Sequence, residues 1–227
     1  MRNILSQSTR ALLGAMVVAT ASHGEVMDVD GRSALVMQSD VVQLVVDLAG
    51  GSIKDFHRLD HGLNPLQWDS VAFDSTLAET PKKPRSMGHF LCLDRWGPAS
   101  AAEMENGMGW HGEASRVVWE VVQDVVEQDG LLEAVLTADL PLAGLSVRRT
   151  IRMSQAAAVF EVTEAVTNNR PLGRIYNMVQ HPTIGPPFLD KTTVVDANAG
   201  KGFMQGGTLP NPEEPSVMWP QALKRDG

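Results

Sequence analysis

The chain contains a single cysteine, Cys92, among its 227 residues. One cysteine excludes an internal disulfide and leaves no cysteine-rich metal motif. It lies in the apolar run Phe90-Leu91-Cys92-Leu93, so we interpret it as a small buried hydrophobic residue. A nucleophilic role would need a base and an orienting group beside the thiol, and the sequence points to neither.

Positive charge is also scarce, because 19 Lys and Arg residues oppose 27 Asp and Glu residues, for a formal net charge of −8. Nucleic-acid binding needs clustered basic side chains that displace counterions from phosphates. The only tight basic cluster is Lys82-Lys83-Pro84-Arg85. Such a run is usually a solvated loop, with a phosphate or sugar-phosphate contact as the alternative. We therefore expect no nucleic-acid partner.

The apolar run near the N-terminus is too short for a permanent membrane anchor. It covers residues 11–19, after Arg2 and Arg10, and ends in the small-x-small pattern Ala19-Thr20-Ala21 that signal peptidases accept. A helix over residues 11–21 would rise only about 16 Å, against a hydrocarbon core of about 30 Å. We predict a secretory signal peptide over residues 1–21, a mature chain of residues 22–227 without membrane attachment, and a secreted or periplasmic location. A buried N-terminal helix is the alternative.

Helical periodicity is absent beyond this segment, and the apolar pattern instead repeats every second residue. In residues 145–153 the odd positions are apolar except Arg149, and the even positions are polar. In residues 160–167 Glu164 is the exception on the apolar side. Alternation of this kind indicates strands with one solvated face. Further strands are predicted at residues 33–38, 41–48, 116–123, 131–139, 174–180 and 192–196. Many short strands without a βαβ rhythm predict an all-β, antiparallel β-sandwich or barrel.

Two stretches depart from the strand pattern. Residues 75–112 are rich in Pro, Gly, Met and charge, with a short apolar patch at residues 90–93. A connection of that length inside a compact β domain is usually functional or disordered. Residues 206–227 contain four prolines and no closing strand, so we expect the sandwich to be incomplete at its C-terminus.

His57 and His61 lie four residues apart, as metal ligands do on one face of a helix. Turn-like segments, residues 50–53 before them and residues 62–65 after them, argue against a helix. A third ligand is not identifiable. The sequence therefore favours a solvated loop here and predicts no metal site.

Two other histidines are better candidates for chemistry. His111 lies among glycines that let backbone and ligand approach closely, and it follows Trp110, whose indole can stack on a sugar face. His181 stands in Gln180-His181-Pro182 at the end of a predicted strand, where loops on a rigid scaffold carry function. Taken singly, each is better explained as a surface histidine or one with satisfied hydrogen bonds.

Taken together, several segments resemble the galactose-mutarotase-like (aldose 1-epimerase-like) superfamily. Gly88 to Pro98 resembles the family's Gly-Gly-x-x-x-Cys-x-x-x-x-Gly-Pro segment, with Met87 in place of the first glycine. His111-Gly112-Glu113-Ala114-Ser115-Arg116 is similar to its His-Gly-x-Ala-Arg segment, with one residue inserted. Gln180-His181-Pro182 resembles its Asn-His-Pro element, 181 − 111 = 70 residues beyond the first histidine. Residues 50–53 with 64–66 are similar to its opening hairpin, and the resemblance covers roughly residues 33 to 205.

The resemblance implies a galactose-mutarotase-like supersandwich that interconverts the anomers of an aldose by opening its ring. His181 would then be the general acid at the ring oxygen, and His111 would bind and polarise the neighbouring hydroxyls, roles that suit groups titrating near neutral pH. Further substrate contacts would come from Arg85 or Arg95, Trp110 and Glu113. The implied partner is a small sugar or glycan, and no metal or organic cofactor is implied.

One feature of the family is missing from the sequence. The family's general-base Glu lies well after the second histidine, and only 227 − 181 = 46 residues follow His181 here. Glu213 and Glu214 stand between two prolines, which predicts a solvated loop. Three functions therefore stay open: an exported aldose 1-epimerase-like isomerase, a non-catalytic carbohydrate-binding module on the same sandwich, and an unrelated exported interaction domain.

Overall fold

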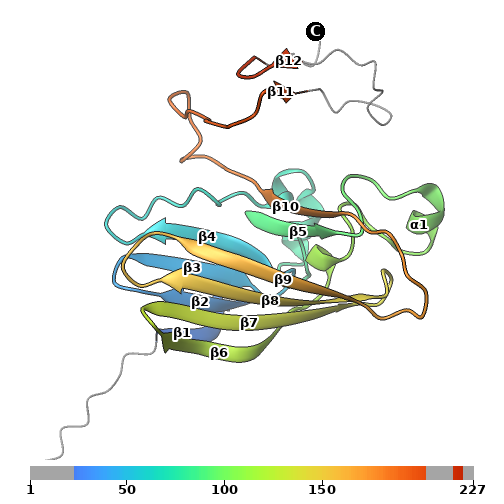
Figure 1. The fold of residues 1–227 in the computed structure, drawn as a ribbon, viewed down its shortest axis with the longest axis horizontal. Helices are drawn as coiled ribbons and strands as arrows, with labels where there is room; N and C mark the ends of the chain where they lie inside the picture. The colour runs from blue at the N-terminus through green and yellow to red at the C-terminus, as the bar shows by residue number, and fades with distance from the viewer. Residues whose placement is uncertain (1–22, 203–216, 222–227) are drawn as a thin grey trace, which may run out of the picture. The chain divides into compact units, whose positions relative to one another are not determined.

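The computed structural model describes residues 23–202 and 217–221 (Figure 1). The predicted signal peptide over residues 1–21 and the two carboxylates Glu213 and Glu214 lie outside the described residues. The chain divides into two compact units, Met1–Leu189 and Asp190–Gly227. In the second unit β11 (Lys201–Gly202) pairs antiparallel with β12 (Val217–Met218).

The first unit contains two antiparallel sheets (Figure 1). The six-stranded sheet consists, in spatial order, of β1 (Gly24–Val29), β2 (Arg32–Gln38), β3 (Val42–Asp47), β4 (Ser52–Arg58), β5 (His89–Leu93) and β10 (Met178–Pro182). The four-stranded sheet consists of β6 (Glu120–Gln128), β7 (Leu131–Leu140), β8 (Leu145–Ser154) and β9 (Phe160–Asn168). The short helices are η1 (Ser70–Ala72), η2 (Ser75–Glu79), α1 (Ala101–Glu105) and η3 (Ala114–Arg116). The predicted all-β antiparallel sandwich is confirmed.

A single apolar cluster joins the inner faces of the two sheets. Leu44 and Leu91 of the six-stranded sheet and Leu136 and Ile151 of the four-stranded sheet belong to it, each no more than 1% exposed. Burying one such side chain is worth about 1.5–3 kcal/mol, so this cluster is the main source of stability. Cys92 is buried as well, as its apolar neighbours predicted. Its burial raises the pKa of the thiol to about 12.

Arg149 and Glu164, the two charged exceptions in the apolar pattern, are directly opposite each other on β8 and β9. Their side chains are 3% and 2% exposed, and Arg149 Nη2 lies 2.6 Å from Glu164 Oε1. The guanidinium also lies 4.2 Å from the ring centroid of Trp119 and donates to the carbonyl of Gly51. An unpaired buried charge is strongly destabilising. Arg149 and Glu164 can therefore be buried because each neutralises the charge of the other.

Five of the predicted strands match β2, β3, β7, β8 and β9 to within one residue at each end. Two others match only in part, and one was wrong. The strand predicted at residues 116–123 overlaps β6, which starts later, at Glu120, after η3. The one predicted at residues 174–180 also starts later, at Met178, because Arg174 turns aside to pair with Asp94. Residues 192–196 contain no strand.

The structure also contains order where turns or disorder were expected. The prediction of a turn at residues 52–53 and a loop around His57 was wrong, because both lie in β4. β1 was not predicted at all; it is an edge strand whose Val26 and Met27 are 45% and 44% exposed. Residues 75–112 hold η2, β5 and α1, and are therefore not a disordered connection. Among the residues described, no helix is both long and apolar enough to cross a membrane.

Candidate functional site

His181 is placed by the pairing of β10 with β5, in which it stands opposite Phe90. Side chains alternate between the faces of a strand. Because Leu91 and Leu93 point into the core, Phe90 and His181 lie on the outer face of the sheet. Their rings stack with centroids 4.5 Å apart at an interplanar angle of 16°. His181 Nδ1 lies 3.1 Å from Thr183 Oγ1, which leaves Nε2 for a ligand.

His111 reaches the same place from the loop between α1 and η3. Gly112 pairs with Leu93 at the end of β5 in an isolated parallel bridge. A Cβ on Gly112 would lie 2.1 Å from the Leu93 carbonyl oxygen, and the backbone there has φ +83°, so only glycine fits. The imidazole of His111 lies 5.2 Å from that of His181 and 5.7 Å from the ring of Phe90, centroid to centroid.

Both ring nitrogens of His111 face N–H donors, which favours the neutral form of the imidazole. Nδ1 faces the backbone N–H of Gly97 at 3.1 Å, and Nε2 faces the indole N–H of Trp110 at 2.6 Å. A neutral imidazole has only one acceptor nitrogen, so the two N–H groups cannot both be bonded at once. Burial, together with the nearby charges of His181 and Arg116, lowers the pKa of His111 to about 4. His111 is therefore neutral at pH 7.

The Gly97 backbone fixes the tautomer of His111. The carbonyl of Gly97 accepts from the backbone N–H of His111 at 2.9 Å, which holds the Gly97 N–H against Nδ1. Trp110 is 55% exposed, so its side chain is the partner that can move. With Nδ1 as the acceptor, Nε2–H becomes a donor for a ligand oxygen once the indole turns aside. The arrangement can bind a hydroxyl group beside an exposed aromatic face.

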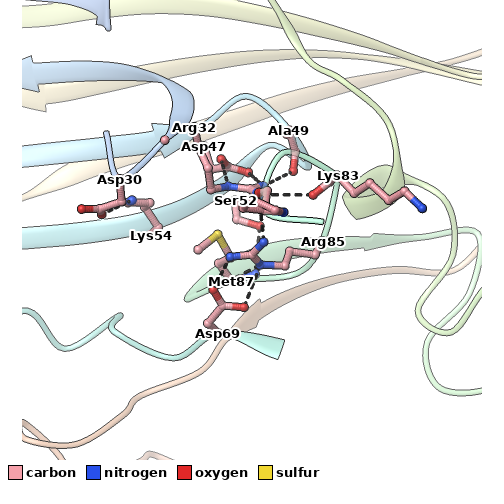
Figure 2. Close-up of polar contacts among 12 residues, drawn as sticks. Asp30, Arg32, Asp47, Ala49, Ser52, Lys54, Asp69, Lys83, Arg85 and Met87 are labelled. Carbon is pink, nitrogen blue, oxygen red and sulfur yellow. Dashed lines mark hydrogen bonds and ion pairs between the residues drawn. The ribbon is translucent and has the colours of Figure 1, made fainter. Parts of the chain in front are cut away.

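The other predicted substrate contacts have partners of their own. Arg85 forms a two-point ion pair with Asp69 (Figure 2). Arg95 pairs with Glu103 of α1, an interaction that, with the Ser100 hydrogen bonds, lowers the pKa of Glu103 to about 2. Within the described part of the chain, neither arginine forms a hydrogen bond or ion pair with His111 or His181.

Glu113 is 5% exposed, and its two carboxylate oxygens accept from the backbone N–H groups of Leu142 and Ala143, at 3.2 and 3.0 Å. These bonds tie the β7–β8 turn to the His111 loop. The structure therefore gives Glu113 a positioning contact, and its predicted contact with substrate stays a prediction.

No Asp or Glu among the described residues forms a hydrogen bond or ion pair with either histidine of the site. The same residues contain no group of three or more His, Cys, Asp or Glu side chains placed to hold a metal ion. His57 instead lies 2.8 Å from Asp55 within β4, and His61 stands in the turn that follows. The site is therefore a pair of imidazoles among aromatic rings.

Two cavities flank this part of the fold. The larger, about 860 Å³, has Asp94, Glu103, Arg170 and Arg174 in its walls, and neither histidine lines it. Arg174 pairs with Asp94 and Glu103 with Arg95, whereas Arg170 donates to the backbone carbonyl of Leu142 at 2.9 Å. The smaller, about 600 Å³, includes Trp68, whose ring stacks on Phe90 with centroids 5.9 Å apart. Neither histidine lines this cavity either, but the ring of Phe90 contacts both Trp68 and His181.

Sequence reasoning missed the roles of Phe90 and Trp68. Phe90 was visible only as part of an apolar patch, and Trp68 stands in the loop after β4 without a motif. The one available signal was the strand alternation at residues 89–93, which places Phe90 on the face opposite Leu91.

No protein-family model matches the sequence, and no curated protein matches it. Among solved structures, the crystal structure of HI1317 aligns with 63% of this chain and 51% of its own, at 12% sequence identity and a TM-score of 0.39. The chain thus matches about half the length of that protein. A likeness this weak assigns neither a family nor a function.

Proposed function

We propose that the protein belongs to the galactose-mutarotase-like superfamily and interconverts the α and β anomers of an aldose at the His111–His181 site. The observation that carries the proposal is the 5.2 Å separation of these two imidazoles. The order of the sequence motifs and the antiparallel sandwich support it. The pattern of residues 1–21 supports a further proposal, that the protein is exported to a secreted or periplasmic location.

In the proposed mechanism His181 delivers a proton to the ring oxygen, and the C1 hydroxyl loses its own proton to a solvent water. Protonated His181 donates from Nε2 to the ring oxygen, while its Nδ1–H is held by the hydroxyl of Thr183. The C1–ring-oxygen bond then breaks as the C1 carbonyl forms, and reclosure on the other face gives the second anomer. Neutral His111 donates its Nε2–H to a neighbouring hydroxyl, and the indole of Trp110 packs on the apolar face of the sugar.

A non-catalytic carbohydrate-binding module on the same sandwich is the second candidate. One observation favours it: within the described residues no carboxylate contacts either histidine, so an isomerase would have to release the C1 hydroxyl proton to water without the help of a protein base. Binding of a sugar between imidazoles and aromatic rings needs no such group.

Proton NMR of freshly dissolved α-D-glucose and α-D-galactose separates the two candidates. Acceleration of anomer exchange above the buffer rate supports the isomerase. Saturation transfer from protein to sugar without acceleration supports the binding module. If neither sugar shows transfer or acceleration, both proposals are contradicted.

A further inference from the structure

The cavity of about 600 Å³ is separated from the histidine site by a single buried ring. Trp68 lines the cavity and stacks on Phe90 with centroids 5.9 Å apart at 22°. Phe90 in turn stacks on His181 at 4.5 Å and 16°. Phe90 is only 1% exposed. A ligand can therefore contact Trp68 and His181, the rings that stack on Phe90, but not Phe90 itself.

The chain that leaves His181 also builds the cavity wall. The backbone N–H of Thr183 donates to the Gly88 carbonyl at 2.9 Å, and that of Gly185 donates to the Pro65 carbonyl at 3.0 Å. Gly185 lines the cavity and packs on Trp68, since a Cβ there would lie 3.2 Å from the Trp68 backbone nitrogen. The position of the wall is thus tied to the strand that carries His181.

The ion pair between Arg85 and Asp69 in the cavity wall does not favour binding of an anion. Arg85 Nε and Nη2 bind the two oxygens of Asp69 at 2.9 and 2.8 Å, and Nη1 donates to the Pro81 carbonyl at 3.1 Å (Figure 2). A phosphate or carboxylate would meet the Asp69 carboxylate and find the guanidinium already engaged. A neutral ligand with hydroxyl groups meets no such repulsion.

The wall is held in place before any ligand binds. The buried side chain of Arg32 donates to the carbonyls of Pro81 and Lys83 (Figure 2). Arg32 is itself paired with buried Asp47, with Nε–Oδ1 and Nη2–Oδ2 distances of 2.7 Å. A site that is already formed binds without the entropy cost of ordering its wall.

We propose that this cavity is a second sugar subsite, in which the neighbouring unit of a neutral di- or oligosaccharide stacks on Trp68 while the reducing-end unit occupies the histidine site. This inference rests on the proposed function and narrows its substrate class to the reducing ends of neutral glycans.

Calorimetric titration of the purified protein with methyl β-cellobioside, methyl α-maltoside and methyl β-glucoside tests the subsite. Methyl glycosides do not open their rings, so the affinities are independent of turnover. We expect at least one disaccharide to bind about tenfold more tightly than the monosaccharide, the ratio that one added aromatic contact supplies. Equal affinities for all three would overturn the proposal.

Two tryptophan variants test whether the preference for a disaccharide depends on the cavity. Ala78 is exposed in η2 and lines the cavity, so Ala78→Trp fills it without disturbing the core. The matched control, Ala158→Trp, alters an exposed alanine in the β8–β9 turn. The disaccharide preference should vanish in the first variant and persist in the second. Its persistence in Ala78→Trp, or tighter binding of glucose 6-phosphate than of either disaccharide, would contradict the subsite.

Anomer exchange of free cellobiose and glucose, measured in the same samples, keeps the two proposals distinguishable. Disaccharide binding that depends on the cavity, without any exchange, would contradict the isomerase and still support the subsite. Exchange that is equally efficient on glucose and cellobiose in both variants would support the isomerase and contradict the subsite.

Discussion

The imidazoles of His111 and His181 lie 5.2 Å apart at an interplanar angle of 67°, one carried by a loop and the other by an edge strand. Two local features bring them together. The β5–β10 pairing stacks His181 on Phe90, and the close approach of Gly112 to Leu93 lays the His111 loop against the end of β5. The site therefore depends on backbone geometry as much as on the histidines themselves.

Gly112→Ala should destabilise the protein by about 2–4 kcal/mol, because it adds a backbone clash to an unfavourable positive φ. Its Cβ would lie 2.1 Å from the Leu93 carbonyl oxygen. Gly130→Ala is the control, since φ there is +77° but nothing lies within 4 Å, and it should cost only about 1 kcal/mol. Urea unfolding measures both. Equal losses would mean that the loop does not press against β5.

His111 should remain neutral well into acid. Its pKa of about 4 lies below the ordinary 6.5, so above pH 6.5 it is neutral in both the folded and the unfolded protein. Between pH 6.5 and 4 the unfolded chain takes up a proton that the folded protein refuses. As the pH is lowered through this window, the free energy of unfolding should therefore decrease by up to about 1.4 kcal/mol per pH unit. Below pH 4 His111 should make no further contribution to the decrease.

Histidine-resolved NMR titration measures that pKa directly, and His111→Asn isolates its share of the pH dependence. The unfolding free energy of the wild type minus that of the variant should decrease as the pH falls from 6.5 to 4, because only the wild type carries this histidine. A His111 pKa at or above 6.5 would contradict the partly buried position of the ring, in which the N–H groups of Gly97 and Trp110 face its two nitrogens.

The buried Arg149–Glu164 pair should be strongly coupled to stability. Glu164→Gln leaves the Arg149 charge buried without its partner, which should cost about 3–5 kcal/mol in unfolding free energy. Glu161→Gln, at an exposed position on the other face of β9, should change stability by no more than about 0.5 kcal/mol. Thermal unfolding of the two variants checks the difference. Similar melting temperatures would show that Arg149 is solvated.

Cys92 should be inert in the folded protein. Burial raises the pKa of its thiol to about 12, so almost no thiolate is present at pH 8 and the side chain is out of contact with solvent. An aromatic disulfide reagent should label no thiol under native conditions and one thiol per chain in guanidinium chloride. Rapid native labelling would contradict the position of Cys92 in β5.

Local sequence patterns were sufficient for most of the fold. Strict alternation identified β8 and β9, and both exceptions in the pattern, Arg149 and Glu164, were visible in the sequence. Their pairing was not, because register between strands depends on long-range packing. β4 was missed because its polar residues follow two glycines, a pattern typical of a turn. The segment is a strand because it forms hydrogen bonds with the neighbouring strands, which the local sequence does not specify.

The candidate site was only partly predictable from the sequence. Motif order indicated His111 and His181, but the contact between them requires the β5–β10 pairing, which no local pattern specifies. Arg85 and Glu113 were expected at the substrate on the strength of resemblance. Their ionic and hydrogen-bond partners, Asp69 and the backbone of the β7–β8 turn, are distant in sequence and therefore could not be anticipated.

The central claim is that His181 acts as the acid in anomer exchange. The most direct measurement is the rate at which α-D-glucose and α-D-galactose convert to their β anomers, followed by proton NMR with wild type, His181→Ala and the control His61→Ala, which alters an exposed histidine in the turn after β4. We predict acceleration by wild type and the control, and a loss of about 10²–10⁴-fold in His181→Ala. A His181→Ala protein that folds and accelerates exchange as fast as wild type would contradict the account.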